Sequence, residues 1–262
     1  MDIVYNFKRA INNGVTKPAL ISTKDGDQYI IKFLHSDCNG KVLFNELVAY
    51  RLAKLLDVPT PNCELLELNK KFIDNNEYFQ ELNAQPCICF ASKYLKGVAD
   101  ISPVFLKASQ NTKDIPSIIL FDQIIMNEDR SVNPGNILYS SKSKKIIAID
   151  HSHIFRNGMI WDIGMIQRME KECPIIIKNA DGNVYKYLGK YIKGNSPFAY
   201  FLDKVSKLEE VDLNGIISGI PEIWEISEAE KESVVRLVKS QIANIDGILE
   251  QLKYYFPDWK GV

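Results

Sequence analysis

The chain has 262 residues, of which 46% are hydrophobic and 25% are charged, and these are ordinary values for a globular protein. Its net charge of -1 gives no general attraction to nucleic acid or to an anionic membrane, so neither is expected as a direct partner. The longest apolar runs are too short to cross a bilayer, and Met1 to Tyr5 does not resemble a signal peptide. We therefore expect a cytoplasmic protein.

The first part of the chain predicts mainly strands. Ala19–Thr23 and Tyr29–Leu34 flank the turn sequence Lys24-Asp25-Gly26-Asp27, which is typical of a hairpin. An amphipathic helix is predicted over Leu43–Leu56, and it ends before the prolines at 59 and 61. Further strands are predicted at Cys63–Leu68, Glu77–Gln80 and Ile88–Leu95.

The pattern becomes helical after about Gly97. Ile115–Met126 predicts a strongly apolar helix, helices dominate beyond residue 196, and Glu228–Tyr255 is one long amphipathic segment there. Strands followed by helices indicate an α+β fold with two lobes. We place a β-rich N-lobe at residues 1–96 and a helical C-lobe at residues 97–262, which together make one domain.

A polar loop and a short hairpin bring candidate metal ligands together. Asn136 precedes a predicted strand at Ile137–Tyr139, and Asp150 follows its partner strand at Ile146–Ile149. In an antiparallel ribbon these two positions lie at the same end, and Asp129 lies on the loop leading into it. Such oxygen ligands suit Mg²⁺ carrying a phosphate, so the hairpin indicates a phosphotransferase.

The same loop has a simpler interpretation. Asp129 and Arg130 are also typical of a surface ion pair, and Asn133-Pro134-Gly135 is a good turn sequence. In a phosphotransferase, Asp129 would instead accept or orient the proton of an attacking hydroxyl. Arg130 would neutralise nearby charge or brace the loop.

Lys32 lies in the apolar strand Tyr29–Phe33, where a charge needs either solvent or a partner. Glu46 on the following helix is the candidate partner, and such a pair would hold the lysine against phosphate oxygens. The alternative is a strand-edge lysine and a helix-surface glutamate. Gly14 precedes the first hairpin strand, where its backbone could approach a phosphate or form an ordinary turn.

The cysteines and histidines give only weak indications of a metal site or a catalytic site. Cys87 and Cys89 would share one face of a strand, but no further thiolates are at hand for a metal, which favours buried free thiols. His151 and His153 flank Ser152, and a structural or hydrogen-bonding role is favoured over metal binding or a hydrolytic site.

Several of these motifs, in this order, resemble the HipA-like kinases, and the match is best with their short branch, often found in bacteria. The motifs are Gly14-Val15-Thr16-Lys17-Pro18, Asp25-Gly26, Lys32-Phe33, Asn45-Glu46, Asn127-Glu128-Asp129-Arg130, Asn133-Pro134-Gly135-Asn136 and Ile149-Asp150-His151. The resemblance covers residues 12–156 well. It implies a two-lobed protein-kinase-like fold and an ATP- and Mg²⁺-dependent transfer of phosphate to a hydroxyl, more often on a protein serine or threonine.

The resemblance also implies a role for individual residues. Lys32 would bind ATP phosphates and pair with Glu46, Asp129 would be the catalytic aspartate, and Asn136 and Asp150 would hold Mg²⁺. Nucleotide contacts would come from the phosphate-covering loop and the connector to the second lobe, at Gly14, Val15, Thr16, Phe90, Ser92, Tyr94 and Leu95.

The sequence departs from many kinases in the catalytic loop. Asn136 follows Asp129 by seven positions instead of five, which leaves Asn133 as the other candidate ligand, and Ser131 stands where many relatives have histidine. A nucleotide-binding pseudokinase or scaffold is therefore the first alternative, and a kinase-like enzyme acting on a small molecule or lipid is another. Expected partners are ATP, an unidentified protein substrate and an antitoxin-like or regulatory partner.

Overall fold

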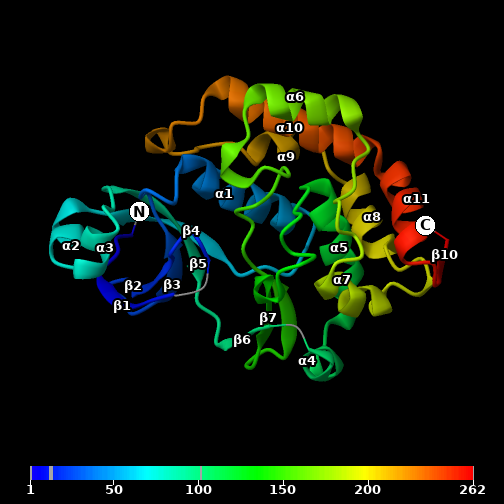
Figure 1. Ribbon diagram of the computed structural model, residues 1–262, viewed down its shortest axis with the longest axis horizontal. Coiled ribbons are helices and arrows are strands. Elements are labelled where there is room, and N and C mark those ends of the chain that lie inside the picture. Colours follow the sequence, from blue (N-terminus) through cyan, green and yellow to red (C-terminus); the bar gives the residue numbers. More distant parts are fainter. Residues whose placement is uncertain (1, 12–13, 101, 262) are drawn as a thin grey trace. The chain divides into compact units, whose positions relative to one another are not determined.

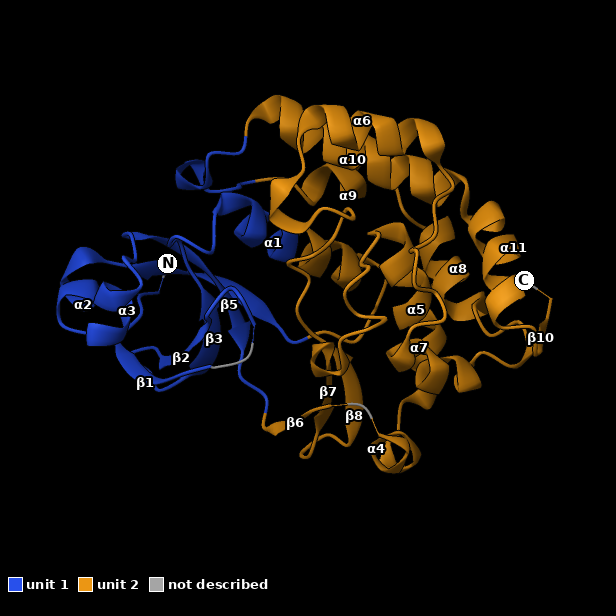
Figure 2. Ribbon diagram, in the orientation of Figure 1, with its two compact units in different colours: residues 1–47, 61–95, 219–226 blue, residues 48–60, 96–218, 227–262 orange. Residues whose placement is uncertain are grey.

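The computed structural model describes residues 2–11, 14–100 and 102–261. The chain forms two compact units (Figure 2). Unit 1 contains residues 1–47, 61–95 and 219–226, and unit 2 contains residues 48–60, 96–218 and 227–262. The main division falls between Leu95 and Lys96, but one helix is shared by both units and a late segment of the chain returns to unit 1.

Unit 1 is built on a five-stranded antiparallel sheet with the strand order β1-β2-β3-β5-β4 (Figure 1). Its strands are β1 (Asn6–Ala10), β2 (Ala19–Ser22), β3 (Gln28–Lys32), β4 (Cys63–Leu68) and β5 (Cys87–Lys93). The residues before β1 contact the edge strand β4 and the interior strand β2, because Val4 N donates to Glu67 O at 2.9 Å and Tyr5 N donates to Ser22 O at 3.0 Å. The N-terminal segment therefore covers part of the edge of β4 that would otherwise be exposed.

Side chains alternate along β3, so one face of the sheet packs into the core and the opposite face carries Lys32; we call the latter the Lys32 face. Tyr29, Ile31 and Phe33 pack into the buried core of unit 1, together with residues of β2, β4 and β5. Because side chains alternate along a strand, Ile30 and Lys32 point to the opposite face of the sheet.

The predicted strand at Glu77–Gln80 is wrong, because this segment belongs to a helical pair, α2 (Lys70–Asp74) and α3 (Glu77–Glu81). Asn69 caps α2 by accepting a hydrogen bond from Phe72 N at 2.9 Å, and α3 follows after two more residues. Phe79 is fully buried against Phe33 and Phe72, and one helical turn is enough to bury it. The local asparagines and this single anchor therefore outweigh the strand propensity of Tyr78 and Phe79.

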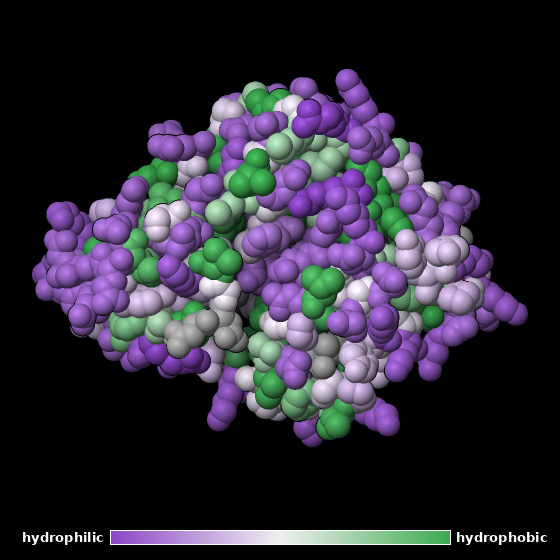
Figure 3. Space-filling view, viewed as in Figure 1, coloured by the Kyte–Doolittle hydropathy of each residue, from purple (hydrophilic) through white to green (hydrophobic). Residues whose placement is uncertain are grey.

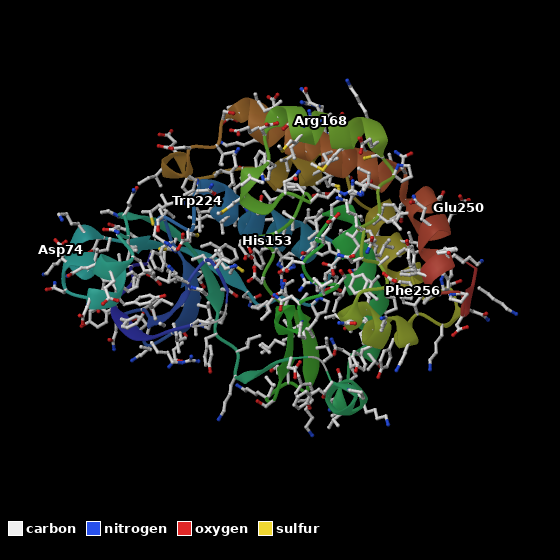
Figure 4. All side chains as sticks on the ribbon, viewed as in Figure 1. Asp74, His153, Arg168, Trp224, Glu250 and Phe256 are labelled. Atoms are coloured by element: carbon white, nitrogen blue, oxygen red, sulfur yellow. The ribbon has the colours of Figure 1, made fainter. Side chains whose placement is uncertain are left out.

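The shared helix α1 (Gly40–Leu55) begins against the segment that returns to unit 1. Trp224, in the short helix η5 (Glu222–Trp224), is almost completely buried, and its indole N–H donates to Ile88 O at 2.7 Å (Figure 4). A Cβ atom on Gly40 would lie 1.9 Å from the carbonyl oxygen of Trp224. Only glycine allows this approach, so Gly40 and Trp224 together fix where α1 starts.

Unit 2 is mainly helical and contains a three-stranded sheet with the order β6-β7-β8. Its strands are β6 (Gly97–Ala99), β7 (Ile137–Ser140) and β8 (Lys145–Ala148), and a short parallel pair is formed by β9 (Gly194–Asn195) and β10 (Trp259–Lys260). The helix α5 (Ile115–Ile124) is buried at every position. The remaining α-helices are α4 (Pro103–Ala108), α6 (Ile163–Glu172), α7 (Asn183–Leu188), α8 (Ala199–Ser206), α9 (Glu210–Gly215), α10 (Glu228–Ala243) and α11 (Ile245–Tyr255).

The amphipathic segment predicted at Glu228–Tyr255 forms two helices, because α10 ends and α11 begins at Asn244 (Figure 1). The Asn244 side chain donates to Ser240 O at 2.8 Å. Gly247 in α11 lies against the ring of Pro174, where a Cβ atom would be 2.7 Å from Cγ. The second helix therefore changes direction to pack on Pro174, although the hydrophobic pattern continues through the break.

Within the described residues, no helix is both long enough and apolar enough to cross a membrane.

We expect Phe79→Ala to destabilise the protein by about 3 kcal/mol, because it removes a fully buried ring and leaves a cavity. Urea unfolding measures the loss, and Tyr5→Ala is the matched control, since the Tyr5 ring is 58% exposed. Equal destabilisation by the two substitutions would contradict this description of the core of unit 1.

Candidate functional site

Lys32 and Glu46 form a buried ion pair within unit 1. The Lys32 Nζ to Glu46 Oε1 distance is 2.5 Å, and the two side chains are only 8% and 4% exposed. Neither residue is therefore a surface charge, which excludes the strand-edge and helix-surface alternative. Burying two charges is unfavourable unless they neutralise each other, so each residue holds the other in place on the Lys32 face of the sheet.

The connector residues begin on the same face. Phe90 lies directly opposite Lys32 in the pairing of β3 with β5, and Ser92 is two positions further along β5 and so on the same face. Tyr94 and Leu95 follow the end of β5, and Tyr94 N donates to Gln28 O at 2.9 Å. The predicted nucleotide-contacting residues of this segment thus begin opposite Lys32 and follow one another along β5 and the residues after it.

The loop at Gly14–Pro18 is held by side chains from elsewhere in unit 1. Gly14 has φ +100°, a conformation that favours glycine, and Lys17 also has a positive φ. The Tyr78 hydroxyl donates to Lys17 O at 2.7 Å, and Lys17 forms a 2.8 Å ion pair with Asp37. Val15 is 66% exposed whereas Thr16 is buried, so Val15 is the accessible side chain at this end of the loop.

His35 connects this loop to the end of β3. Asp37 N–H donates to Nδ1 at 3.2 Å, so Nε2 carries the proton and donates to Thr16 O at 3.0 Å. Burial lowers the pKa of His35, while the hydrogen bond to Thr16 O and the charge of Asp37 act in the opposite direction. Protonation of Nδ1 would set it against the Asp37 N–H, so this contact requires the neutral imidazole.

In unit 2, Asp129 lies beside Asn133 and Asn136, the two asparagines that follow it in the loop before β7. Asn136 Nδ2 donates to Asp129 Oδ2 at 2.6 Å, and Asn133 Nδ2 lies 3.4 Å from the same oxygen. Asn133 also accepts a hydrogen bond from Gly135 N at 3.0 Å and caps the short helix η2 (Pro134–Asn136). The extra residues therefore form a compact turn that returns Asn136 to Asp129.

Arg130 braces the loop. Its side chain is fully buried, and Nε donates to both carboxylate oxygens of Asp122, at 2.8 and 2.9 Å. Its Nη1 donates to Asn136 O at 2.5 Å and to Ile149 O at 2.7 Å. One guanidinium thus holds the backbone on both strands of the hairpin, at Asn136 and next to Asp150, and the surface ion-pair alternative for Arg130 is wrong.

Asp122 and Tyr185 complete this network, and sequence reasoning did not identify either. The Tyr185 hydroxyl donates to Asp122 Oδ2 at 2.9 Å, and both side chains are fully buried. Burial raises the pKa of Asp122, and the charge and hydrogen bonds of Arg130 act against that shift. The available signal was the single charged residue of the mainly apolar run Ile115–Met126, because a charge on a buried helix requires a partner.

Asp150 follows β8 in a left-handed conformation with φ +56°. Its Oδ1 accepts hydrogen bonds from Ser152 Oγ at 2.6 Å and from Ser152 N at 3.2 Å. The neighbouring Ile149 N donates to Asn136 O at 3.1 Å, so Asn136 and Asp150 lie on adjoining backbone at one end of the hairpin. Ser152 is thus a hydrogen-bond partner of Asp150, and His153 Nδ1 lies 3.2 Å from the same hydroxyl.

The donor groups in unit 2 suit a metal that arrives with a nucleotide. Among the residues with described positions, no group of three or more His, Cys, Asp and Glu side chains is arranged to hold a metal ion. Mg²⁺ commonly takes only one or two protein ligands, together with phosphate and water oxygens. The Asp150 carboxylate and the amide oxygen of Asn136 fit that requirement, because the hydrogen bond to Asp129 uses only the Asn136 nitrogen.

The cysteine pair of unit 1 consists of free thiols. The sulfur atoms of Cys87 and Cys89 are 4.0 Å apart, and both residues are buried in the core. Burial raises the pKa of Cys38, also in unit 1, to about 12.

Comparison with known proteins identifies the class of this fold. The Helicobacter pylori proinflammatory kinase CtkA is 16% identical with a TM-score of 0.57, over 96% of this chain and 98% of that one. The Golgi casein kinase is 11% identical with a TM-score of 0.49, over 95% of this chain and 74% of that one. The likeness to CtkA shows that the α+β architecture, with a β-sheet N-terminal region and a helical C-terminal region, is a protein-kinase-like fold.

The sequence assigns the chain within this class. The sequence model of the HipA-like kinase family matches residues 4–163, which include every motif that carried the resemblance, and the chain belongs to that family. No curated protein matches the chain.

We expect Asp122→Asn to destabilise the protein by about 3 kcal/mol, since it leaves the buried guanidinium of Arg130 without its counter-charge. Tyr185→Phe should cost about 1 kcal/mol, because it removes one hydrogen bond and leaves the ion pair intact. Urea unfolding of both variants provides the comparison. Asp203→Asn, in an exposed ion pair with Lys207, is the control and should change stability by less than about 0.5 kcal/mol. An Asp122→Asn loss no larger than that of the control would contradict the bracing role of Arg130.

The pKa of His35 predicts how stability depends on pH. The folded-state pKa lies below the unfolded value of about 6.5, so the unfolded chain binds more protons and stability falls as pH decreases through and below about 6.5. Melting temperatures measured between pH 8 and pH 5 should fall more steeply for the wild type than for His35→Gln. Parallel curves for the two proteins would show that His35 does not carry this dependence.

Proposed function

We propose that this member of the HipA-like kinase family is an ATP- and Mg²⁺-dependent kinase that phosphorylates serine or threonine hydroxyls of a protein. One observation carries the proposal that it is active: Asn136 Nδ2 donates to Asp129 Oδ2 at 2.6 Å despite the seven-residue spacing. A pseudokinase that has lost its catalytic loop has no need of a turn that restores this contact. The contact therefore supports an active kinase over a protein that binds nucleotide without using it.

In the proposed reaction, the residues of unit 1 bind the nucleotide. Lys32, held by Glu46, neutralises phosphate oxygens, and backbone N–H groups at Gly14–Thr16 cover the phosphates. Phe90, Ser92, Tyr94 and Leu95 contact the adenine. Because Glu46 fixes the ammonium group before ATP binds, little side-chain order has to be gained on binding.

The residues of unit 2 carry out the transfer. Asp129 orients the acceptor hydroxyl and takes its proton, the hydroxyl oxygen bonds to the γ-phosphorus, and the bond to the β-phosphate oxygen breaks to release ADP. Asn136 and Asp150 would hold Mg²⁺, which when bound neutralises the charge on the phosphate oxygens. The Asn136 amide keeps the Asp129 carboxylate oriented, and Ser152 does the same for Asp150.

The direct test is transfer from γ-labelled ATP with Mg²⁺, using dephosphorylated casein and histone as protein acceptors and intact mass to detect autophosphorylation. We expect Asp129→Asn and Asp150→Asn to reduce labelling by at least about a hundredfold. Asp258→Asn, an exposed aspartate of the same unit, should leave the labelling unchanged. Labelled protein should release phosphoserine or phosphothreonine after acid hydrolysis.

Melting curves with ATP, with and without Mg²⁺, separate the failures of this proposal. A metal-dependent rise in melting temperature without any labelling would make the chain a pseudokinase. If the melting temperature does not rise and no labelling occurs, the chain does not bind the nucleotide.

A further inference from the structure

A lysine-rich surface lies on unit 2, on segments that the proposed phosphoryl transfer does not use. Residues 96–114 and 139–145 contain six lysines and only two aspartates, although the whole chain has a net charge of -1. The lysines are all exposed, and among the described residues none has a recorded ion pair; they are Lys96, Lys107, Lys113, Lys142, Lys144 and Lys145. We call this the lysine surface.

Backbone contacts join the segments that carry the lysines. Ser141 N and Oγ both donate to Lys96 O, at 3.1 and 3.0 Å, and Gln110 N donates to Lys144 O at 2.9 Å. Asn111 donates to Ile146 O at 2.9 Å and accepts from Ile146 N at 2.8 Å. The lysines therefore sit on one framework made of β6 with the residue before it, α4, the short helix η1 (Thr112–Asp114) and the turn between β7 and β8. Figure 1 shows β6, β7 and α4 next to one another.

The centre of the lysine surface is apolar. Phe105 of α4 stacks on Tyr139 of β7, with ring centroids 5.0 Å apart and an interplanar angle of 18°. Val98, which is 44% exposed, is paired with Tyr139 in the ladder of β6 and β7, and Val104, which is 71% exposed, precedes Phe105 on α4. Figure 3 shows hydrophobic and hydrophilic residues side by side over this part of unit 2. Exposed aliphatic groups surrounded by cations favour a partner that combines acidic and apolar side chains.

The lysine surface also has a strand edge. In the order β6-β7-β8, the strand β6 is at the edge, and all three of its residues are exposed. Gly97 makes the pairing with β7 possible, because a Cβ atom there would lie 2.2 Å from Tyr139 O. Within the described part of the chain, no strand pairs with the outer side of β6, so its backbone can accept an extended peptide.

We propose that the lysine surface binds an extended acidic segment of a partner protein, with alternating acidic and aliphatic side chains, as an added strand on β6. The lysines neutralise its carboxylates, Val98 and Val104 contact its aliphatic groups, and β6 supplies backbone hydrogen bonds. Single-stranded nucleic acid fits less well, because Phe105 and Tyr139 stack on each other and leave only one face of each ring for a base. A membrane surface fits less well because α4 has only six residues and is too short for an amphipathic anchor.

Fluorescence anisotropy tests the proposal with a fluorescein-labelled synthetic peptide that alternates Glu or Asp with Ile or Val. The triple variant Lys107→Glu, Lys142→Glu, Lys145→Glu should weaken binding by at least about tenfold. The matched control is Lys171→Glu, Lys178→Glu, Lys193→Glu, which changes the charge equally at exposed lysines of the same unit and should change the affinity less than twofold. Like the first set, this one has a lysine in the last turn of a helix, which equalises any effect on helix stability.

Two further arms separate the alternatives. The double variant Val98→Ser, Val104→Ser should weaken binding of the alternating peptide but not of an all-glutamate peptide of equal charge. If the surface is purely electrostatic, the double variant changes the affinity for both peptides equally. Tighter binding of oligo(dT) or of phosphatidylserine vesicles than of the peptide would overturn the proposal, as would equal peptide affinity in the two triple variants. The Asp150→Asn variant should bind the peptide like the wild type, so the result does not depend on phosphoryl transfer.

Discussion

The buried guanidinium of Arg130 is the constraint on which the geometry of unit 2 depends. It bonds to the Asp122 carboxylate on one side and to the carbonyl oxygens of Asn136 and Ile149 on the other. Arginine can do this because its planar group carries five donors in a fixed arrangement and stays charged when buried. A lysine would supply the charge but could not bridge a helix and both strands of the hairpin with defined directions. The positions of Asn136 and Asp150 are thus set by the interior of the unit and not by the surface loop that contains Asp129.

Unit 1 uses the same principle with different groups. Lys32 and Glu46 are buried charges that hold each other, and the helix carrying Glu46 starts where Gly40 meets the Trp224 carbonyl. Trp224, which is late in the chain, therefore helps to position Glu46, although the two residues are far apart in the sequence. In both units, the candidate functional groups rest on polar contacts that are shielded from water, where such contacts are strongest.

The sequence predicted the parts of the structure that local patterns determine. The hairpin strands, the buried helix and the pairing of Lys32 with Glu46 follow from alternation, apolar periodicity and the need of a buried charge for a partner. At Glu77–Gln80 the aromatic residues Tyr78 and Phe79 favour a strand, whereas the Asn69 cap and the burial of Phe79 against Phe33 favour a helix. The packing of α11 on Pro174 after the break at Asn244, and the Tyr185 contact to Asp122, depend on residues far away in the sequence, which no local pattern reveals.

The seven-residue spacing between Asp129 and Asn136 illustrates the same limit. From sequence alone, either Asn133 or Asn136 could serve, and the longer loop could equally have separated the carboxylate from the amide. In the structure, Asn133 caps the turn and Asn136 contacts Asp129, so the two asparagines have different tasks. The hydrogen bonds of the structure identify the turn, whereas the sequence of residues 129–136 is compatible with several turn conformations.

The central claim is that Asn136 and Asp150 hold the metal that accompanies the nucleotide. Electron paramagnetic resonance of Mn²⁺, titrated into the protein saturated with a non-hydrolysable ATP analogue, measures this most directly. The account predicts that Asp150→Ala and Asn136→Ala each weaken Mn²⁺ binding by about tenfold or more relative to the wild type, with Asp258→Ala unchanged. Equal Mn²⁺ affinity in the wild type and the Asp150→Ala variant would contradict it.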